Sequence, residues 1–105
     1  MNLNELAEKA WNTSRIREQN GANVKIKDIM KHAAGEVIEA AEARIRWREN
    51  DFASPIDKAD YAEELADVII CVLIAAANDD IDIDQALTSK MCKNELRAEK
   101  TGDKL

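Results

Sequence analysis

Two pairs of acidic residues at helical spacing are the side chains of this sequence best suited to chemistry. Glu36 and Glu39 form the first pair, and Glu64 and Asp67 form the second. Residues three apart on a helix share one face, with Cβ atoms about 5–6 Å apart. Because neighbouring carboxylates repel one another, four of them between packed helices require a cation. Mg²⁺ binds carboxylates together with substrate phosphates, so the two pairs predict a magnesium site for phosphoryl chemistry.

The second pair strengthens a prediction that the first pair alone would not support. A single E-x-x-E spacing arises by chance on the solvated faces of charged helices. Asp67, however, is followed directly by the most apolar segment of the chain, residues 68–77. Acidic side chains beside a hydrophobic core are usually paired or bound to a metal. Two such pairs on consecutive antiparallel helices can face each other and form one site.

A group of basic and amide side chains near the end of the sequence is the expected partner of the acids. It comprises Lys90, Lys93, Asn94, Arg97 and Lys100. We expect this group to bind the phosphate oxygens whose negative charge the metal ion does not neutralise. An ordinary solvated helix end is the alternative, because cations near a helix C-terminus interact favourably with the helix dipole.

Two further residues are candidates for contact with a substrate. His32 lies one turn before Glu36 and is placed to contact a substrate, although a single histidine beside a core more often makes a packing hydrogen bond. We expect Trp11 mainly to pack in the core, and stacking on a nucleobase is its functional alternative.

The composition predicts one mostly helical domain spanning residues 1–105. Hydrophobic residues make up 46 % of the chain and charged residues 34 %, with three Gly and one Pro, so few residues interrupt helices. The net charge of −6 argues against a nucleic-acid duplex as a partner, because its phosphates require a basic surface. The first residues lack the pattern of a signal peptide and no apolar run is long enough to span a bilayer. A cytoplasmic protein without a membrane partner is therefore expected.

Four helices are expected to position these side chains. The first three are predicted at residues 3–19, 25–50 and 55–78, and the fourth begins at residue 82 or 84. The tail from residue 99 is expected to be mobile. Asn2 and Ser54 are expected to cap the first and third helices, and Pro55 suits a first helical position. The second half of the third helix is apolar on every side, so another subunit is expected to cover part of it. Cys71 and Cys92 are expected to be buried, reduced thiols.

The order and spacing of the acidic and basic motifs match a known pattern. An E-x-x-E motif, a loop, an E-x-x-D motif and then K-x-x-x-N-x-x-R follow one another over about residues 33–100. This order resembles the MazG-like nucleoside triphosphate pyrophosphohydrolases. The resemblance implies an all-α, four-helix MazG-like bundle assembled as a homodimer or as a homotetramer built from two dimers. It also implies metal-dependent cleavage of a nucleoside triphosphate to the monophosphate and pyrophosphate. We expect Mg²⁺ as the metal, with Mn²⁺ as a substitute, and deoxynucleotides as substrates.

The same resemblance implies roles for individual residues. The implied Mg²⁺ ligands are Glu36, Glu39, Glu64 and Asp67, and the implied triphosphate ligands are Lys90, Lys93, Asn94 and Arg97. We expect Glu39 to act as the general base, with Glu36 as the second candidate catalytic residue. Gly35 stands where the family often has a further glutamate, which leaves the number of metal ions open.

Other functions stay open at this point. A phosphoribosyl-ATP pyrophosphatase or a dUTPase-like relative shares the metal chemistry and differs in substrate. A di-iron carboxylate bundle is disfavoured because it uses Glu-x-x-His motifs, whereas His32 precedes its glutamate. A non-catalytic helical module that binds metal or a partner is the third alternative. If its acids are merely solvated, Mg²⁺ should leave its melting temperature unchanged.

Overall fold

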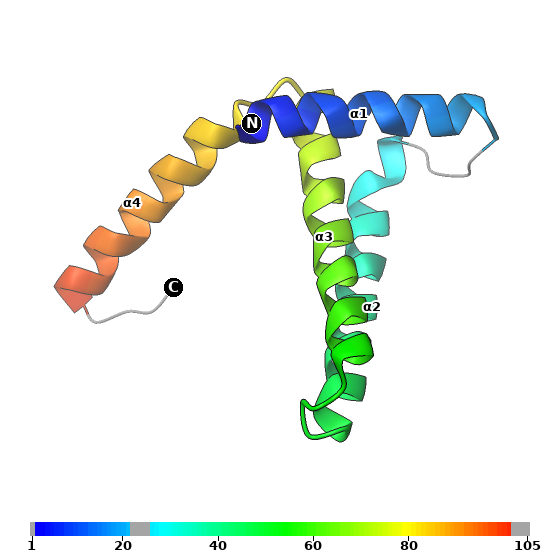
Figure 1. Cartoon of the computed structure of the whole chain (residues 1–105). Helices are drawn as coiled ribbons and strands as arrows, with labels where there is room; N and C mark the ends of the chain where they lie inside the picture. The colour runs from blue at the N-terminus through cyan, green and yellow to red at the C-terminus, as the bar shows by residue number, and fades with distance from the viewer. Residues whose placement is uncertain (1, 22–25, 102–105) are drawn as a thin grey trace.

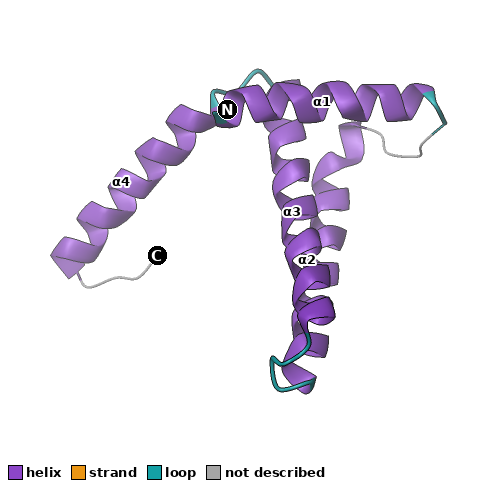
Figure 2. Ribbon diagram, in the orientation of Figure 1, coloured by secondary structure: helices purple, strands orange, loops and turns teal. Residues whose placement is uncertain are grey.

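Helices form every regular element in residues 2–21 and 26–101, which are the residues that the computed structural model describes (Figure 2). The elements are α1 (Leu3–Gln19), the short 3₁₀ helix η1 (Ile26–Asp28), α2 (Ile29–Glu49), α3 (Pro55–Asn78) and α4 (Ile83–Thr101) (Figure 1). The predicted all-helical architecture with four α-helices is confirmed.

Local capping interactions begin α1 and α3 at the predicted residues. The side-chain oxygen of Asn2 accepts a hydrogen bond of 2.8 Å from the Glu5 amide. The Ser54 hydroxyl accepts one of 3.2 Å from the Asp57 amide, and Pro55 occupies the first turn of α3. Each cap satisfies an amide that the helix itself cannot pair.

The start of α4 is fixed by Asp82 and is tied to the start of α1. Asp82 accepts hydrogen bonds from the Gln85 amide at 3.0 Å and from the Asn4 side chain at 2.8 Å. The hydrogen bond from Asn4, with that from the Gln85 backbone, lowers the pKa of Asp82. Asp84, the other residue considered as the start of this helix, instead accepts a hydrogen bond of 3.2 Å from the Leu3 amide.

Three predictions about the elements need correction. The second helix begins at Ile29, because residues 26–28 form the 3₁₀ turn η1, and the predicted start at residue 25 lies outside the described residues. The helical backbone of α4 continues to Thr101, where a mobile tail was expected from residue 99; residues 102–105 are not described. Cys71 is buried, whereas Cys92 is exposed on α4.

The core lies where α2 and α3 pack along each other and α1 crosses one end of the pair (Figure 1). Three of the four buried residues of α2 are alanines, and two of them, Ala40 and Ala43, are 6 % and 1 % exposed. Such small side chains let the two helix backbones approach closely. Larger buried residues, Cys71, Leu73 and Ile74, come from the half of α3 nearer to α1. The close packing of α2 on α3 is what brings their acidic residues together.

A small aromatic cluster of Trp47, Phe52 and Tyr61 lies at the turn between α2 and α3. The Trp47 ring lies 4.9 Å from the Phe52 ring, edge to face, and 5.9 Å from the Tyr61 ring. The Phe52 amide donates a hydrogen bond of 2.9 Å to the Trp47 carbonyl. These contacts fix the turn at the end of the pair opposite α1.

The fourth helix projects away from the α2–α3 pair (Figure 1) and packs chiefly against α1. The radius of gyration is 16.5 Å, whereas a compact domain of this length has about 13 Å. No helix in the described parts of the chain is long and apolar enough to cross a membrane.

Candidate metal centre

Three of the four predicted acidic ligands converge where α2 and α3 pack side by side. One carboxylate oxygen from each of Glu36, Glu64 and Asp67 lies within 4.8 Å of the other two. Glu36 comes from α2 and the other two come from α3, so the cluster exists only because the two helices meet. A set of carboxylate oxygens at this separation suits a hard cation such as Mg²⁺.

Two carboxylate oxygens of these acids are buried and lack a protein partner. Glu36 Oε2 and Glu64 Oε2 have no hydrogen bond within the described structure, and the Glu36 side chain is only 14 % exposed. Leaving a charged oxygen buried and unpaired is costly. The other oxygen of Glu36 lies 3.3 Å from His32 Nε2. The acids therefore fit a bound cation that would satisfy the two unpaired oxygens.

Burial and mutual repulsion raise the pKa of two of the acids. Burial is the main cause for Glu36, whose pKa lies above its ordinary value of 4.5, and the charges of Glu39 and Asp67 add to it. Burial is also the first cause of the raised pKa of Glu64, and the charge and hydrogen bonding of Glu39 follow. Burial and the nearby negative charges therefore disfavour the ionised forms of Glu36 and Glu64, and a bound cation would favour them.

Glu39 lies beside the three converging acids without belonging to their set. Its effect on the pKa of both Glu36 and Glu64 places it within reach of each, and its side chain is exposed. The motif resemblance implied that all four acids are metal ligands. Among the described residues, the mutually close oxygens come from Glu36, Glu64 and Asp67, and Glu39 lies next to this set.

A cavity of about 600 Å³ opens beside the acids, between α1 and the α2–α3 pair. Its polar lining comprises Lys9, Thr13, Ser14 and Arg17 from α1, His32 and Glu36 from α2, and Asp67 from α3. Sequence reasoning considered only Trp11 on α1 and missed these four residues of the helix. The spacing of Lys9, Thr13 and Arg17, four residues apart each time, was visible in the sequence. It could not show that this face of α1 overlies the acids.

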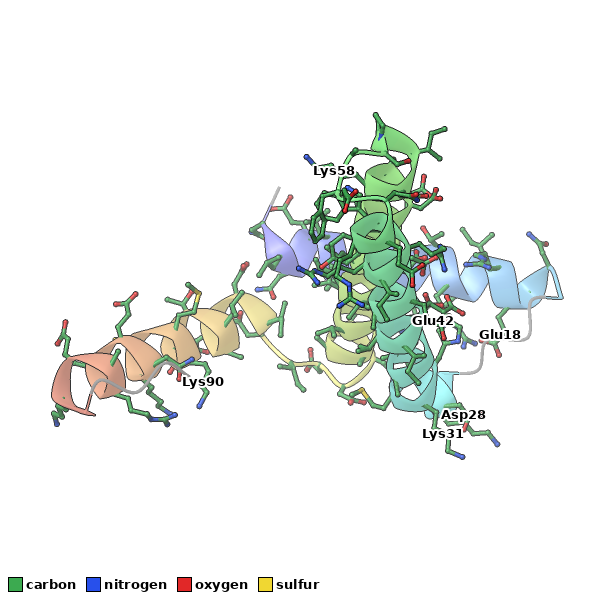
Figure 3. The ribbon with its side chains drawn as sticks, turned by 90° about the horizontal axis from the view of Figure 1, so that it is seen from below. Glu18, Asp28, Lys31, Glu42, Lys58 and Lys90 are labelled. Carbon is green, nitrogen blue, oxygen red and sulfur yellow. The ribbon has the colours of Figure 1, made fainter. Side chains whose placement is uncertain are left out.

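The remaining predicted substrate residues lie elsewhere in the chain. Trp11 packs against the core and lines a separate hollow with Asn12 and Ala77. The basic and amide group of α4, residues 90–100, contributes no described residue to the cavity beside the acids. Figure 3 shows Lys90 on α4, well away from Glu42 of α2. A substrate role for Trp11 or for the α4 group stays a prediction.

Residues 3–91 match the model of a protein family described as phosphoribosyl-ATP pyrophosphohydrolase. The chain belongs to this family. The matched residues include the four acids and end within α4, before Lys93. Comparisons with curated proteins and with solved structures give no match.

Membership supports a pyrophosphohydrolase that acts on a nucleotide, which is a hydrolase of acid anhydrides. A phosphoribosyl-ATP pyrophosphatase is the alternative to the MazG-like enzymes that the motifs left open. The match is to an all-α family of the nucleoside triphosphate pyrophosphatase type, so the broader class is confirmed. The narrower MazG-like assignment is not part of what the match shows.

Proposed function

We propose that this protein is a Mg²⁺-dependent hydrolase that cleaves a nucleoside triphosphate between its α- and β-phosphates, releasing the monophosphate and pyrophosphate. The observation that carries the proposal is the convergence of Glu36, Glu64 and Asp67 beside a cavity. The MazG-like order of motifs favours (deoxy)nucleoside triphosphates as substrates. Phosphoribosyl-ATP is the second candidate substrate, because the matching family is named for it.

The acidic residues divide into two roles in this proposal. Glu36, Glu64 and Asp67 would hold Mg²⁺, which when bound neutralises phosphate charge and makes water a better nucleophile. Glu39 is exposed and adjacent to the three acids, so we assign it to accept the proton of the attacking water. His32, 3.3 Å from Glu36, would orient that carboxylate. Attack in line with the bond to the β-phosphate then expels pyrophosphate.

Incubation of the purified protein with Mg²⁺ and a panel of substrates tests the reaction. The panel contains the common NTPs and dNTPs, dUTP among them, and phosphoribosyl-ATP, and chromatography resolves the products. We expect a monophosphate product and pyrophosphate from at least one member, and the ranking of the members identifies the substrate.

Two outcomes of that panel would contradict the proposal. A diphosphate and inorganic phosphate would show a hydrolase that cleaves a different bond. No product from any member, with a folded sample whose melting temperature responds to Mg²⁺, would favour the non-catalytic metal-binding module.

We also propose that the protein works as a homodimer or homotetramer. Apolar side chains that one protomer leaves exposed gather on three helices: Val37, Ile38 and Ile45 on α2, Leu65, Ile69 and Val72 on α3, and Leu87, Met91 and Leu96 on α4. Groups of exposed large apolar side chains often mark a protein–protein contact surface. Most helices in proteins also depend on packing for stability, and α4 packs chiefly on α1. A second copy would cover these surfaces and would bring the basic residues of its α4 toward the acids.

Light scattering coupled to size exclusion should therefore give a mass of two or four chains. Ile69, 56 % exposed on α3, offers the matching variant. Ile69→Asp places a charge on the proposed contact surface and should shift the mass toward one chain and lower the melting temperature. The conservative change Ile69→Val should retain the wild-type mass. A wild-type protein that elutes as one chain at all concentrations would contradict the proposal.

A further inference from the structure

The cavity beside the acids has walls of opposite charge. Glu36 and Asp67 form part of its α2–α3 wall, and Lys9 and Arg17 belong to its α1 wall. The two cations are eight residues apart in α1, with Thr13 between them, so at about 100° per residue they share one broad side of the helix. Its volume of about 600 Å³ lies within the range of about 300–1,000 Å³ for small-molecule sites.

The positive charges of Lys9 and Arg17 are not neutralised by acidic side chains in the described part of the protein. Within the described residues, neither Lys9 nor Arg17 forms an ion pair, whereas Arg15 pairs with Glu18 at 2.6 Å and lies over the Trp11 ring. A position in the last turn of α1 favours Arg17 through the helix dipole. The helix dipole does not account for a cation at Lys9, which lies in the middle of the helix.

Ser14 adds an unsatisfied polar atom to the same wall. Its hydroxyl oxygen is buried and has no hydrogen-bond partner in the described structure, and its side chain lines the cavity. A buried hydroxyl without a partner is uncommon in folded proteins. The α1 wall thus offers two charged groups and one hydroxyl to whatever occupies the cavity.

We propose that α1 binds the phosphate chain of the substrate from the side opposite the acids, with Lys9 and Arg17 as the phosphate ligands and Ser14 as an additional hydrogen-bonding group. This inference rests on the proposed function. A polyphosphate bound between the walls presents some oxygens to the acidic wall with its cation and the others to α1. Charged hydrogen bonds then neutralise the second set.

The test measures both turnover and the binding of inorganic pyrophosphate with Mg²⁺. In Lys9→Gln and Arg17→Gln we expect KM for the best substrate to rise about tenfold each, since a hydrogen bond to a charged group contributes about that factor. We expect kcat to change by less than about threefold, because this contact is present in both the bound substrate and the transition state. Calorimetry should show an equivalent loss of affinity for magnesium pyrophosphate. Arg17→Lys, which retains the positive charge, should bind magnesium pyrophosphate more tightly than Arg17→Gln and more weakly than the wild type.

Lys31→Gln is the matched control. Lys31 is an exposed lysine at the start of α2, labelled in Figure 3, and does not line the cavity. It should leave KM and pyrophosphate affinity at wild-type values. Because Lys9 and Arg17 are exposed, circular dichroism should show all variants folded.

The two readouts separate this inference from the proposed function. Wild-type turnover with unchanged KM and pyrophosphate affinity in both α1 variants would overturn the inference alone. Weaker binding of a nucleoside monophosphate with normal pyrophosphate affinity would also overturn it, by assigning α1 to the base or sugar. A wild-type protein that hydrolyses no nucleotide would overturn the proposed function. Weaker pyrophosphate binding by the α1 variants would still support the α1 phosphate contact.

Discussion

Glu36→Gln is expected to abolish hydrolysis and to remove the effect of Mg²⁺ on the melting temperature. Glu36 is 14 % exposed and is the only α2 residue among the three converging acids. Loss of this charge should weaken the stabilisation of the transition state by the metal ion. Because that stabilisation is worth several kcal/mol, turnover should fall by roughly 10³-fold. Mg²⁺ at about 100 times its Kd should raise the wild-type melting temperature by roughly 10 °C, and the variant should lose most of this increase.

The same variant should be more stable than the wild type when metal is absent. The pKa of Glu36 is raised above its ordinary value of 4.5 by burial, so the folded state binds more protons than the unfolded state in the window above that value. Stability of the metal-free wild type should therefore fall as pH rises from about 4.5 through the folded-state pKa. Glu36→Gln has no such proton to lose, so its thermal unfolding should show a smaller fall over the same window.

Glu42→Gln is the control for this experiment. Glu42 is an exposed acid on the same helix and is not among the converging acids. It should keep wild-type activity, Mg²⁺ response and pH dependence of stability. A Glu36→Gln protein that retains both turnover and the full Mg²⁺ effect would show that the acids do not form the metal centre.

Glu39→Gln is expected to reduce kcat by roughly 10²–10⁴-fold, the usual contribution of a general base. Because Glu39 lies outside the set of three oxygens within 4.8 Å of one another, most of the Mg²⁺ effect on the melting temperature should remain. Glutamine keeps the shape of the side chain and cannot accept the proton. Steady-state kinetics at saturating Mg²⁺, together with thermal unfolding with and without Mg²⁺, separates the two effects.

Two results would contradict the role given to Glu39. Turnover within a few fold of wild type would mean that another group accepts the proton. Loss of the Mg²⁺ effect on the melting temperature would instead make Glu39 a metal ligand, as the motif resemblance implied. Glu42→Gln again provides the baseline, since it removes one charge from α2 outside the converging set.

Helix boundaries were the most predictable part of the fold, because short-range interactions determine them. Asn2 and Ser54 accept hydrogen bonds from amides three residues ahead, so each cap is visible in a few letters of sequence. The start of α2 was less predictable. The 3₁₀ turn η1 precedes it, and Asp28 at its N-cap makes no side-chain hydrogen bond. Without a local cap, the apolar periodicity alone misplaced the boundary.

The acidic site was predictable in its residues and less so in its geometry. The i, i+3 spacing places Glu64 and Asp67 on one face of α3 whatever the rest of the chain does. Which oxygens converge depends on how α2 sits against α3, and the close approach at Ala40 and Ala43 sets that contact. That Glu36, Glu64 and Asp67 each contribute an oxygen to one set, with Glu39 next to it, is therefore a property of the packing.

The sequence by itself determined that this chain is helical and that it carries two acidic pairs, because helical periodicity and capping act over only a few residues. The tertiary structure alone decided that Lys9, Ser14 and Arg17 face the acids across a cavity and that α4 projects away from them. The physical reason is that the crossing of one helix over a helix pair depends on side chains distant in sequence. No local pattern encodes it.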